Sequence, residues 1–228
     1  MPFDWSDVDE TVREGEARYW QMNAILYALC DTLGSNTEEA AVYAKTMIVG
    51  RTYQTRIEAI TGWSKKGGKR NEKPIDRVCK AILGCVELDD QIDAIRCMGD
   101  CPISEQSISP VIRAHSLLCN ALKKFSRGNE ARSFASKYLH FHARSVPIYD
   151  SVAAAVVKLW CKPSQWNDIK SSEMWKEMFK KHSQFPSQPY ARHCHMLALM
   201  AKMWQTAKVK VPTPTARNLD TYLMACGN

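Results

Sequence analysis

One stretch in the second half of the chain combines two predicted helices, a turn between them and a carboxylate at the head of a third helix. Residues 123–153 read KKFSRGNEARSFASKYLHFHARSVPIYDSVA. Gly128 marks the turn, and the apolar residues of 134–139 recur at helical spacing. Val146-Pro147 closes the next loop and leads to Asp150. A tight turn between helices exposes backbone N–H groups that can hold a DNA phosphate.

Helical periodicity extends from this stretch over the rest of the chain. Asn36 or Thr37 is the expected cap of the second helix, and Val209–Val211 is the one short β-like run. The pattern predicts an all-α fold with a single compact helical domain over residues 1–228; two helical lobes with a DNA-binding groove between them are the alternative arrangement. The predicted helices are Val12–Leu33, Thr37–Ile60, one from Pro74, Asp89–Met98, Val111–Phe125, Ala131–His142, Asp150–Cys161, Ser171–Lys181, Gln188–Lys208 and Thr215–Ala225.

The composition is that of a globular protein with a basic excess. Hydrophobic residues make up 45% of the 228 residues, and the formal net charge is +7. This excess favours polyanionic partners such as nucleic acid. The acidic start of the chain lacks a secretory signal pattern, and no apolar run reaches the roughly 18–20 residues that span a bilayer. We therefore expect a cytoplasmic, monomeric protein without a membrane partner, whose nine cysteines stay reduced.

The stretch 123–153 resembles the signature of the helix-hairpin-helix DNA glycosylase superfamily, which includes the 8-oxoguanine, adenine-mismatch and alkylpurine glycosylases and endonuclease III. Ser133-Phe134-Ala135 corresponds to the first signature element and Pro147-Ile148-Tyr149-Asp150 to the second. Residues 215–223 resemble the closing helix of bacterial relatives in the oxoguanine branch. The hairpin is degenerate, because Asn129 and Ala131 stand where the family has Gly-x-Gly.

The resemblance implies that Asp150 is the catalytic carboxylate of a base-excising enzyme. Ser133 stands where bifunctional relatives carry their attacking lysine, and Lys137 lies too close in sequence to Asp150 for the usual spacing. An absent lysine implies a monofunctional DNA glycosylase that hydrolyses the N-glycosidic bond without lyase activity. Ser133, Lys137 and Tyr149 are the expected pocket residues. An ordinary helix N-cap is the other role open to Asp150, and the two roles can coexist.

The expected substrate is duplex DNA with the target base flipped out of the stack. A modified or damaged base is implied, and a modified base of phage DNA is included, so both DNA repair and antiviral defence are open. A glycine-containing loop combines an aromatic side chain with cations, which suits nucleic-acid binding. The expected DNA contacts are Trp63, Lys65, Lys66, Lys69, Arg70, Lys123, Lys124, Arg127 and Gly128.

Histidine and cysteine spacings argue against a metal site. His140 and His142 are two residues apart and cannot both face one site of a regular helix, so we expect one at the surface and one at the edge of the core. The same expectation holds for His193 and His195. The cysteines at 79, 85, 97 and 101 match neither a zinc knuckle nor the iron–sulfur pattern of endonuclease III. No metal or cofactor is expected.

Two other functions remain open from the sequence. The same fold could serve as a non-catalytic DNA-binding module for distorted or modified DNA. The chain could instead be a helical protein-interaction adaptor whose likeness to glycosylases at 123–153 is accidental. Release of a base separates the glycosylase from the binding module, and salt-dependent DNA binding separates both from the adaptor.

Overall fold

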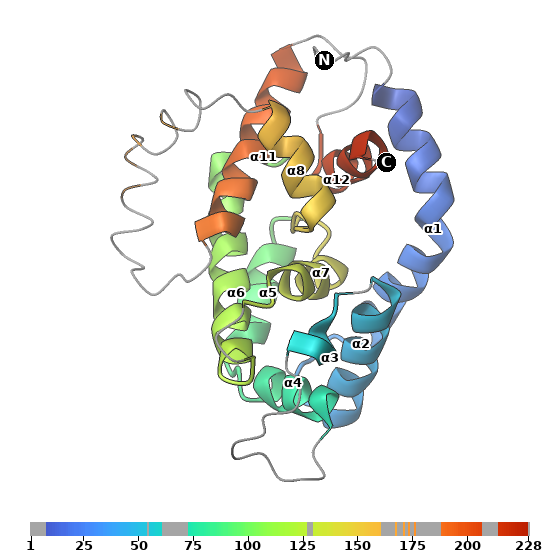
Figure 1. The fold of residues 1–228 in the computed structure, drawn as a ribbon, viewed down its shortest axis with the longest axis vertical. Coiled ribbons are helices and arrows are strands. Elements are labelled where there is room, and N and C mark those ends of the chain that lie inside the picture. Colours follow the sequence, from blue (N-terminus) through green and yellow to red (C-terminus); the bar gives the residue numbers. More distant parts are fainter. Residues whose placement is uncertain are drawn as a thin grey trace.

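The computed structural model describes residues 8–53, 55–60, 73–126, 130–160, 188–206 and 214–227, together with positions 167, 171, 173 and 176. The fold over these residues is all-α, as predicted (Figure 1). In the described part of the chain, no helix is both long and apolar enough to cross a membrane. The helices are α1 (Val8–Thr32), α2 (Glu39–Thr52), α3 (Ile57–Ile60), α4 (Pro74–Leu83), α5 (Leu88–Arg96), α6 (Glu105–Lys123), α7 (Arg132–His142), α8 (Ser151–Trp160), α11 (Gln188–Thr206) and α12 (Ala216–Gly227).

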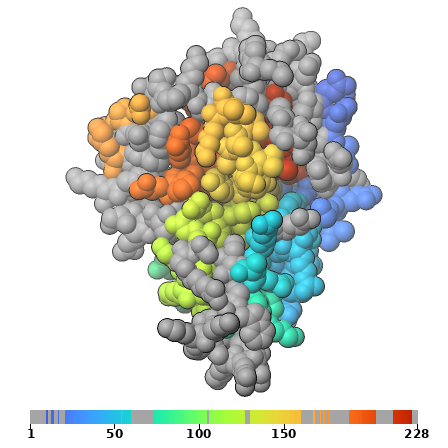
Figure 2. All heavy atoms as spheres, viewed as in Figure 1, coloured from blue at the N-terminus to red at the C-terminus, as the bar shows by residue number. Residues whose placement is uncertain are grey.

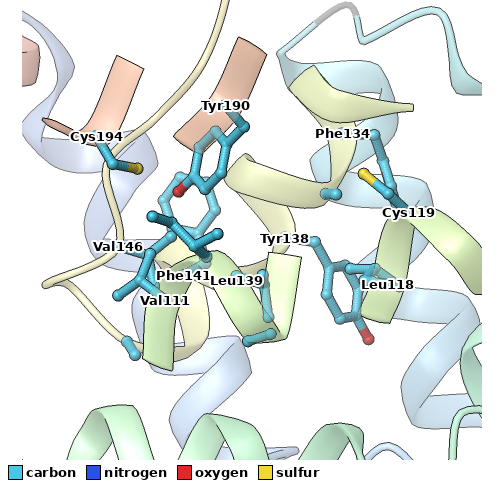
Figure 3. Close-up of a cluster of buried hydrophobic side chains, with 14 of the residues drawn as sticks. Val111, Leu118, Cys119, Phe134, Tyr138, Leu139, Phe141, Val146, Tyr190 and Cys194 are labelled. Carbon is cyan, nitrogen blue, oxygen red and sulfur yellow. The ribbon is translucent and has the colours of Figure 1, made fainter. Parts of the chain in front are cut away.

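Helix α7 is the central element of the core. All its residues from 134 to 142 are buried, because α1, α2, α5 and α6 pack around it. Figure 3 shows Phe134, Tyr138 and Leu139 of α7 among side chains of α6 and α11. Every described helix contributes at least one side chain to a single hydrophobic cluster. Burial of this continuous apolar surface is the main term that stabilises the fold.

Helix α12 lies between α1 and α8, and α11 packs on α6 and α8 (Figure 1). Figure 2 shows α8 at the molecular surface, directly beside α11. An antiparallel bridge between Pro102 and Thr215 joins the segment before α6 to the start of α12. These contacts bring the beginning of α8, the middle of α7 and α12 together, although they are far apart in the sequence.

The second predicted helix, Thr37–Ile60, is divided in the structure. Helix α2 ends at Thr52, and α3 begins at Ile57. Arg56 between them has a φ of 54°, in the left-handed region that interrupts a regular helix. The N-cap of α2 is Glu38, and its side chain makes no capping bond. The prediction of a cap at Asn36 or Thr37 is therefore wrong.

Asn36 has a different role, in the core beside α2. Its amide Nδ2 donates to Asp89, and its Oδ1 accepts from Lys45 at 2.8 Å and from Tyr138 at 2.6 Å. The Lys45 ammonium also donates to the carbonyls of Leu33 and Ser35, just after α1. Lys45 is fully buried, and these bonds offset the desolvation of its charge.

Helix α6 begins six residues before the predicted Val111. The Ser104 hydroxyl accepts from the Ser107 backbone N–H at 3.2 Å, and the Ser107 hydroxyl accepts from the Ser104 N–H at 2.8 Å, which closes a reciprocal cap. Pro110 lies inside the helix, in its second turn. A proline there removes one hydrogen bond, to the carbonyl of Gln106, and the strong cap compensates for this loss.

The histidine predictions are also wrong. His140 and His142 are 0% and 3% exposed, and His193 and His195 are each 3% exposed. The expectation assumed that a helix has one solvent face. Helix α7 has none from residue 134 to its end, because other helices cover it there, so both of its histidines lie in the core.

Candidate functional site

Asp150 stands at the junction between the α7–α8 loop and helix α8. Its Oδ1 accepts the backbone N–H of Ala153 at 2.8 Å, which is the geometry of a helix N-cap. A negative charge at this end of α8 is also stabilised by the helix dipole. The Asp150 side chain is 16% exposed, so the protein does not enclose it completely.

Side chains from two helices hold the loop before Asp150 at four successive residues. The Val146 carbonyl accepts from Nδ1 of His140 at 2.7 Å, the Pro147 carbonyl from the Tyr190 hydroxyl at 2.9 Å, and the Ile148 carbonyl from Nε2 of His193 at 3.1 Å. The Tyr149 N–H donates to Oγ of Ser136 at 3.0 Å. Because every donor and acceptor in this set is buried or half-buried, the position of Asp150 is fixed before any ligand arrives.

Lys137 is the closest charged partner of Asp150. Its Nζ lies 3.6 Å from Oδ2 of Asp150, and its side chain is 7% exposed. The same Nζ lies 5.3 Å from the ring centroid of Tyr53, whose hydroxyl donates to Oδ1 of Asn23. The ammonium is thus placed between a carboxylate and an aromatic face, and both stabilise its charge. The folded chain thus brings together the expected pocket residue Lys137 and the expected carboxylate Asp150.

Ser133 and Tyr149, the other two predicted pocket residues, have less direct roles. Ser133 lies one turn before Lys137 in α7 and is half-buried, and its carbonyl accepts from the Ser136 hydroxyl at 3.1 Å. The Tyr149 ring makes edge contacts with the rings of Tyr190 and His193. Both rings belong to α11, so Tyr149 anchors the loop before Asp150 to that helix.

A second carboxyl group, which the sequence analysis did not identify, interacts electrostatically with this pair. Asp220 of α12 is 5% exposed, and its Oδ2 lies 3.4 Å from the Arg217 guanidinium. Burial raises its pKa to about 7; Arg217 lowers it, Asp150 raises it, and Lys137 lowers it further. Among the described residues, Oδ1 of Asp220 has no hydrogen-bond partner. The expected likeness of residues 215–223 to a family helix does not indicate this carboxyl group, because an aspartate in a helix carries no signal of burial.

Tyr27 of α1 and His140 of α7 form a neutral polar pair. The His140 Nδ1–H must donate to the Val146 carbonyl, which only accepts, so Nε2 accepts from the Tyr27 hydroxyl at 2.6 Å. Burial lowers the pKa of His140 to about 3 and raises that of Tyr27 to about 12. The Arg144 guanidinium lies 4.5 Å from the centroid of the Tyr27 ring. His140 therefore serves as a fixed donor and acceptor and does not exchange protons near neutrality.

The predicted DNA contacts are described only in part. Lys123 and Lys124 are exposed at the C-terminal end of α6. In Figure 1 this end lies next to α4, whereas α8 begins near the centre of the molecule. Lys124 also acts electrostatically on Cys85, in the turn after α4, which agrees with the packing of α6 on α4. Trp63, Lys65, Lys66, Lys69, Arg70, Arg127 and Gly128 lie outside the described residues.

The described residues contain no group of three or more His, Cys, Asp or Glu side chains that could hold a metal ion. The seven described cysteines are free thiols. What the site offers chemically is a preorganised, partly accessible carboxylate paired with an ammonium, and a second carboxyl group close by. No known protein family, no curated protein and no solved structure matches this chain.

Proposed function

We propose that the chain is a DNA glycosylase in which Asp150 stabilises the positive charge that develops on the deoxyribose as the base leaves. The observation that carries this proposal is the geometry of Asp150. The carboxylate is fixed by the loop and by its cap, keeps 16% exposure, and has one oxygen outside the cap bond. A preorganised charge of this kind costs little reorganisation in the transition state.

In the proposed reaction the bond between the base nitrogen and C1′ breaks, and the base leaves with the electron pair. Positive charge then spreads over C1′ and the ring oxygen, where a carboxylate stabilises it. Water adds to C1′ and loses a proton to Asp150 or to solvent, while the base takes up a proton. The products are the free base and an abasic site in an uncut strand. The target base must leave the stack to reach a side chain in this position.

The experiment compares the wild-type chain with Asp150→Asn on genomic DNAs that carry different base modifications, including DNA from phages with bulky modified bases. Free base and abasic sites are measured together. Asparagine keeps a side-chain oxygen for the Ala153 cap bond and removes the charge, so the fold is retained. Wild-type protein should release base from at least one DNA, and Asp150→Asn should release base at least about 100-fold more slowly. Equal release by both proteins contradicts the proposal.

The position of Lys137 favours a second candidate, a glycosylase with lyase activity. An unprotonated Nζ in this position could attack C1′ and form an imine with the opened sugar, which is followed by elimination of the 3′ phosphate. Borohydride reduces such an imine to a stable protein–DNA adduct. The hydrolytic candidate predicts no adduct and an uncut strand. The lyase candidate predicts an adduct that disappears in Lys137→Gln.

The non-catalytic alternative gives a third pattern in the same assays. A DNA-binding module would retain duplex DNA with a steep dependence on salt, and would release no base from any of the DNAs. A protein-interaction adaptor would show no salt-dependent DNA binding. The measurements therefore assign one outcome to each function.

A further inference from the structure

Asp220 is a buried acidic side chain in α12, and the packing of that helix does not require an acidic residue at this position. Its side chain is 7% exposed, it lies at the fifth position of α12, and its Oδ1 has no partner in the described part of the chain. A buried carboxylate without a full set of hydrogen bonds is costly, and a neutral side chain would fill the same space without that cost. The packing of α12 alone therefore does not account for an acidic group at this position.

The groups that interact electrostatically with Asp220 come from four parts of the fold. Arg217 approaches from the preceding turn of α12, Asp150 from the start of α8, Lys137 from α7, and the Tyr27 hydroxyl from α1. Helix α12 packs directly on both α1 and α8, so these interactions belong to the same interior region. Tyr27 stays neutral near pH 7, because burial raises its pKa to about 12. Asp220 is therefore coupled to three charges.

We propose that Asp220 is the second carboxyl group of the site and acts as a positioning residue that sets, through its own protonation, the net charge around the Lys137–Asp150 pair. When Asp220 is neutral, the formal charges of Lys137, Arg217 and Asp150 leave one net positive charge in the region. When Asp220 is ionised, the region is neutral. A net positive charge opposes a cation that develops nearby, and its removal favours that cation.

The titration of Asp220 falls in the range where this change matters. Burial raises its pKa to about 7, and the balance between Asp150 and the two cations refines that value. A pair of carboxyl groups whose environments separate their pKa values is a common way to divide roles in an active site. Asp150 keeps the accessible position, and Asp220 changes the charge behind it without touching the substrate.

A titration that does not depend on activity tests the coupling. The full chain is labelled with ¹³C at the aspartate carboxyl carbons, and the carboxyl signals are followed by NMR from about pH 4 to about pH 9. Asp220→Asn and Asp150→Asn assign the two signals. The Asp220 midpoint should lie near 7 in the wild type. It should move lower in Asp150→Asn and higher in Lys137→Gln, because Asp150 raises and Lys137 lowers the pKa of Asp220. A midpoint that neither variant moves overturns the inference.

The consequence for the reaction rests on the proposed function. The excision rate of the wild type should rise about tenfold as pH increases through neutrality, and Asp220→Asn should stay at the low-pH rate throughout. Asp90→Asn, at an exposed aspartate in the first turn of α5, is the matched control and should keep the wild-type profile. An active Asp220→Asn with the wild-type profile overturns the inference and leaves the proposed function standing. If the wild-type protein excises no base, the proposed function is contradicted. The NMR titration then tests the electrostatic coupling of Asp220 by itself.

Discussion

The Nζ atom of Lys137 lies 3.6 Å from Oδ2 of Asp150, while Oδ1 of the same carboxylate accepts the Ala153 N–H at 2.8 Å. The two oxygens of Asp150 therefore have different partners. One closes the first turn of α8, and the other faces the ammonium of α7. The structural role of a helix cap and a role for the charge are not alternatives here, because they use different atoms. Substitutions can separate the two.

Asp150→Asn and Asp150→Ala should differ in their free energy of unfolding by the contribution of the N-cap bond to Ala153. Asparagine caps a helix about as well as aspartate, so Asp150→Asn loses only the attraction to Lys137. Asp150→Ala loses the cap as well, which lowers the free energy of unfolding by about 1 kcal/mol more. Urea denaturation of the three proteins measures the difference. Equal stabilities of the two variants would show that the Ala153 bond contributes nothing.

Tyr27→Phe should destabilise the chain by about 1–2 kcal/mol, because it leaves the buried Nε2 of His140 without its donor. Tyr43→Phe is the matched control, since Tyr43 also packs against the core and this substitution removes the same hydroxyl group. The control should change the free energy of unfolding by less than about 0.5 kcal/mol. Thermal or urea denaturation gives both values. A loss in Tyr43→Phe as large as that in Tyr27→Phe would contradict the assigned role of the His140 bond.

The helical class of the fold could be predicted because apolar residues at three- and four-residue spacing depend on local sequence alone. The same is true of Asp150 at the head of α8, which follows from Val146-Pro147 and the apolar helix after it. The predicted start of α6 is wrong, because a pair of capping serines begins this helix before the proline that usually marks a first turn. Pro110 suggested a helix start at Val111, but the reciprocal cap of Ser104 and Ser107 begins α6 earlier.

The arrangement of the site could not be predicted, because it depends on contacts between distant segments. The α7–α8 loop turns Asp150 back towards Lys137 because Tyr190 and His193 of α11 hold its carbonyls. Asp220 reaches the same region because α12 lies between α1 and α8. Neither packing relationship leaves a mark in the spacing of residues along the chain. The contact between Lys137 and Asp150 could therefore not be predicted from their spacing.

Acidification should destabilise the chain well before its carboxylates are fully protonated. Burial lowers the pKa of His115 and His140 to about 3 and that of His193 and His195 to about 4, and it places that of His142 well below the usual value. The folded state therefore keeps these imidazoles neutral, while the unfolded state takes up protons below about pH 6.5. The unfolding free energy then falls as pH decreases, by up to about 1.4 kcal/mol per pH unit for each histidine.

Asp220 acts in the opposite direction over part of this range. Its folded pKa of about 7 lies above the unfolded value, so its protonation stabilises the folded state as pH falls below 7. Protonation of Asp220 offsets the destabilisation that comes from about one of the five histidines. The unfolding free energy therefore still falls as pH decreases. Urea denaturation at about pH 7.5, 6 and 5 measures the trend. A constant unfolding free energy between pH 7 and 5 would mean that the described histidines are accessible to protons in the folded state.

Lys123 and Lys124 should contribute to DNA affinity without contributing to the reaction. Both are exposed at the C-terminal end of α6, away from the start of α8 (Figure 1). Each lysine that neutralises a phosphate contributes about 0.9 to the slope of log K against log salt concentration. The double variant Lys123→Ala/Lys124→Ala should therefore lower that slope by up to about 1.8 and weaken binding about equally for all duplex sequences.

The base-release step in a saturated complex should be unchanged in this double variant, because the C-terminal end of α6 lies next to α4 and away from the start of α8. Lys202→Ala, which removes one positive charge from the exposed side of α11, is the control and should leave the slope within about 0.3 of the wild type. If the double variant binds with the wild-type slope, the α6 end is not part of the DNA interface.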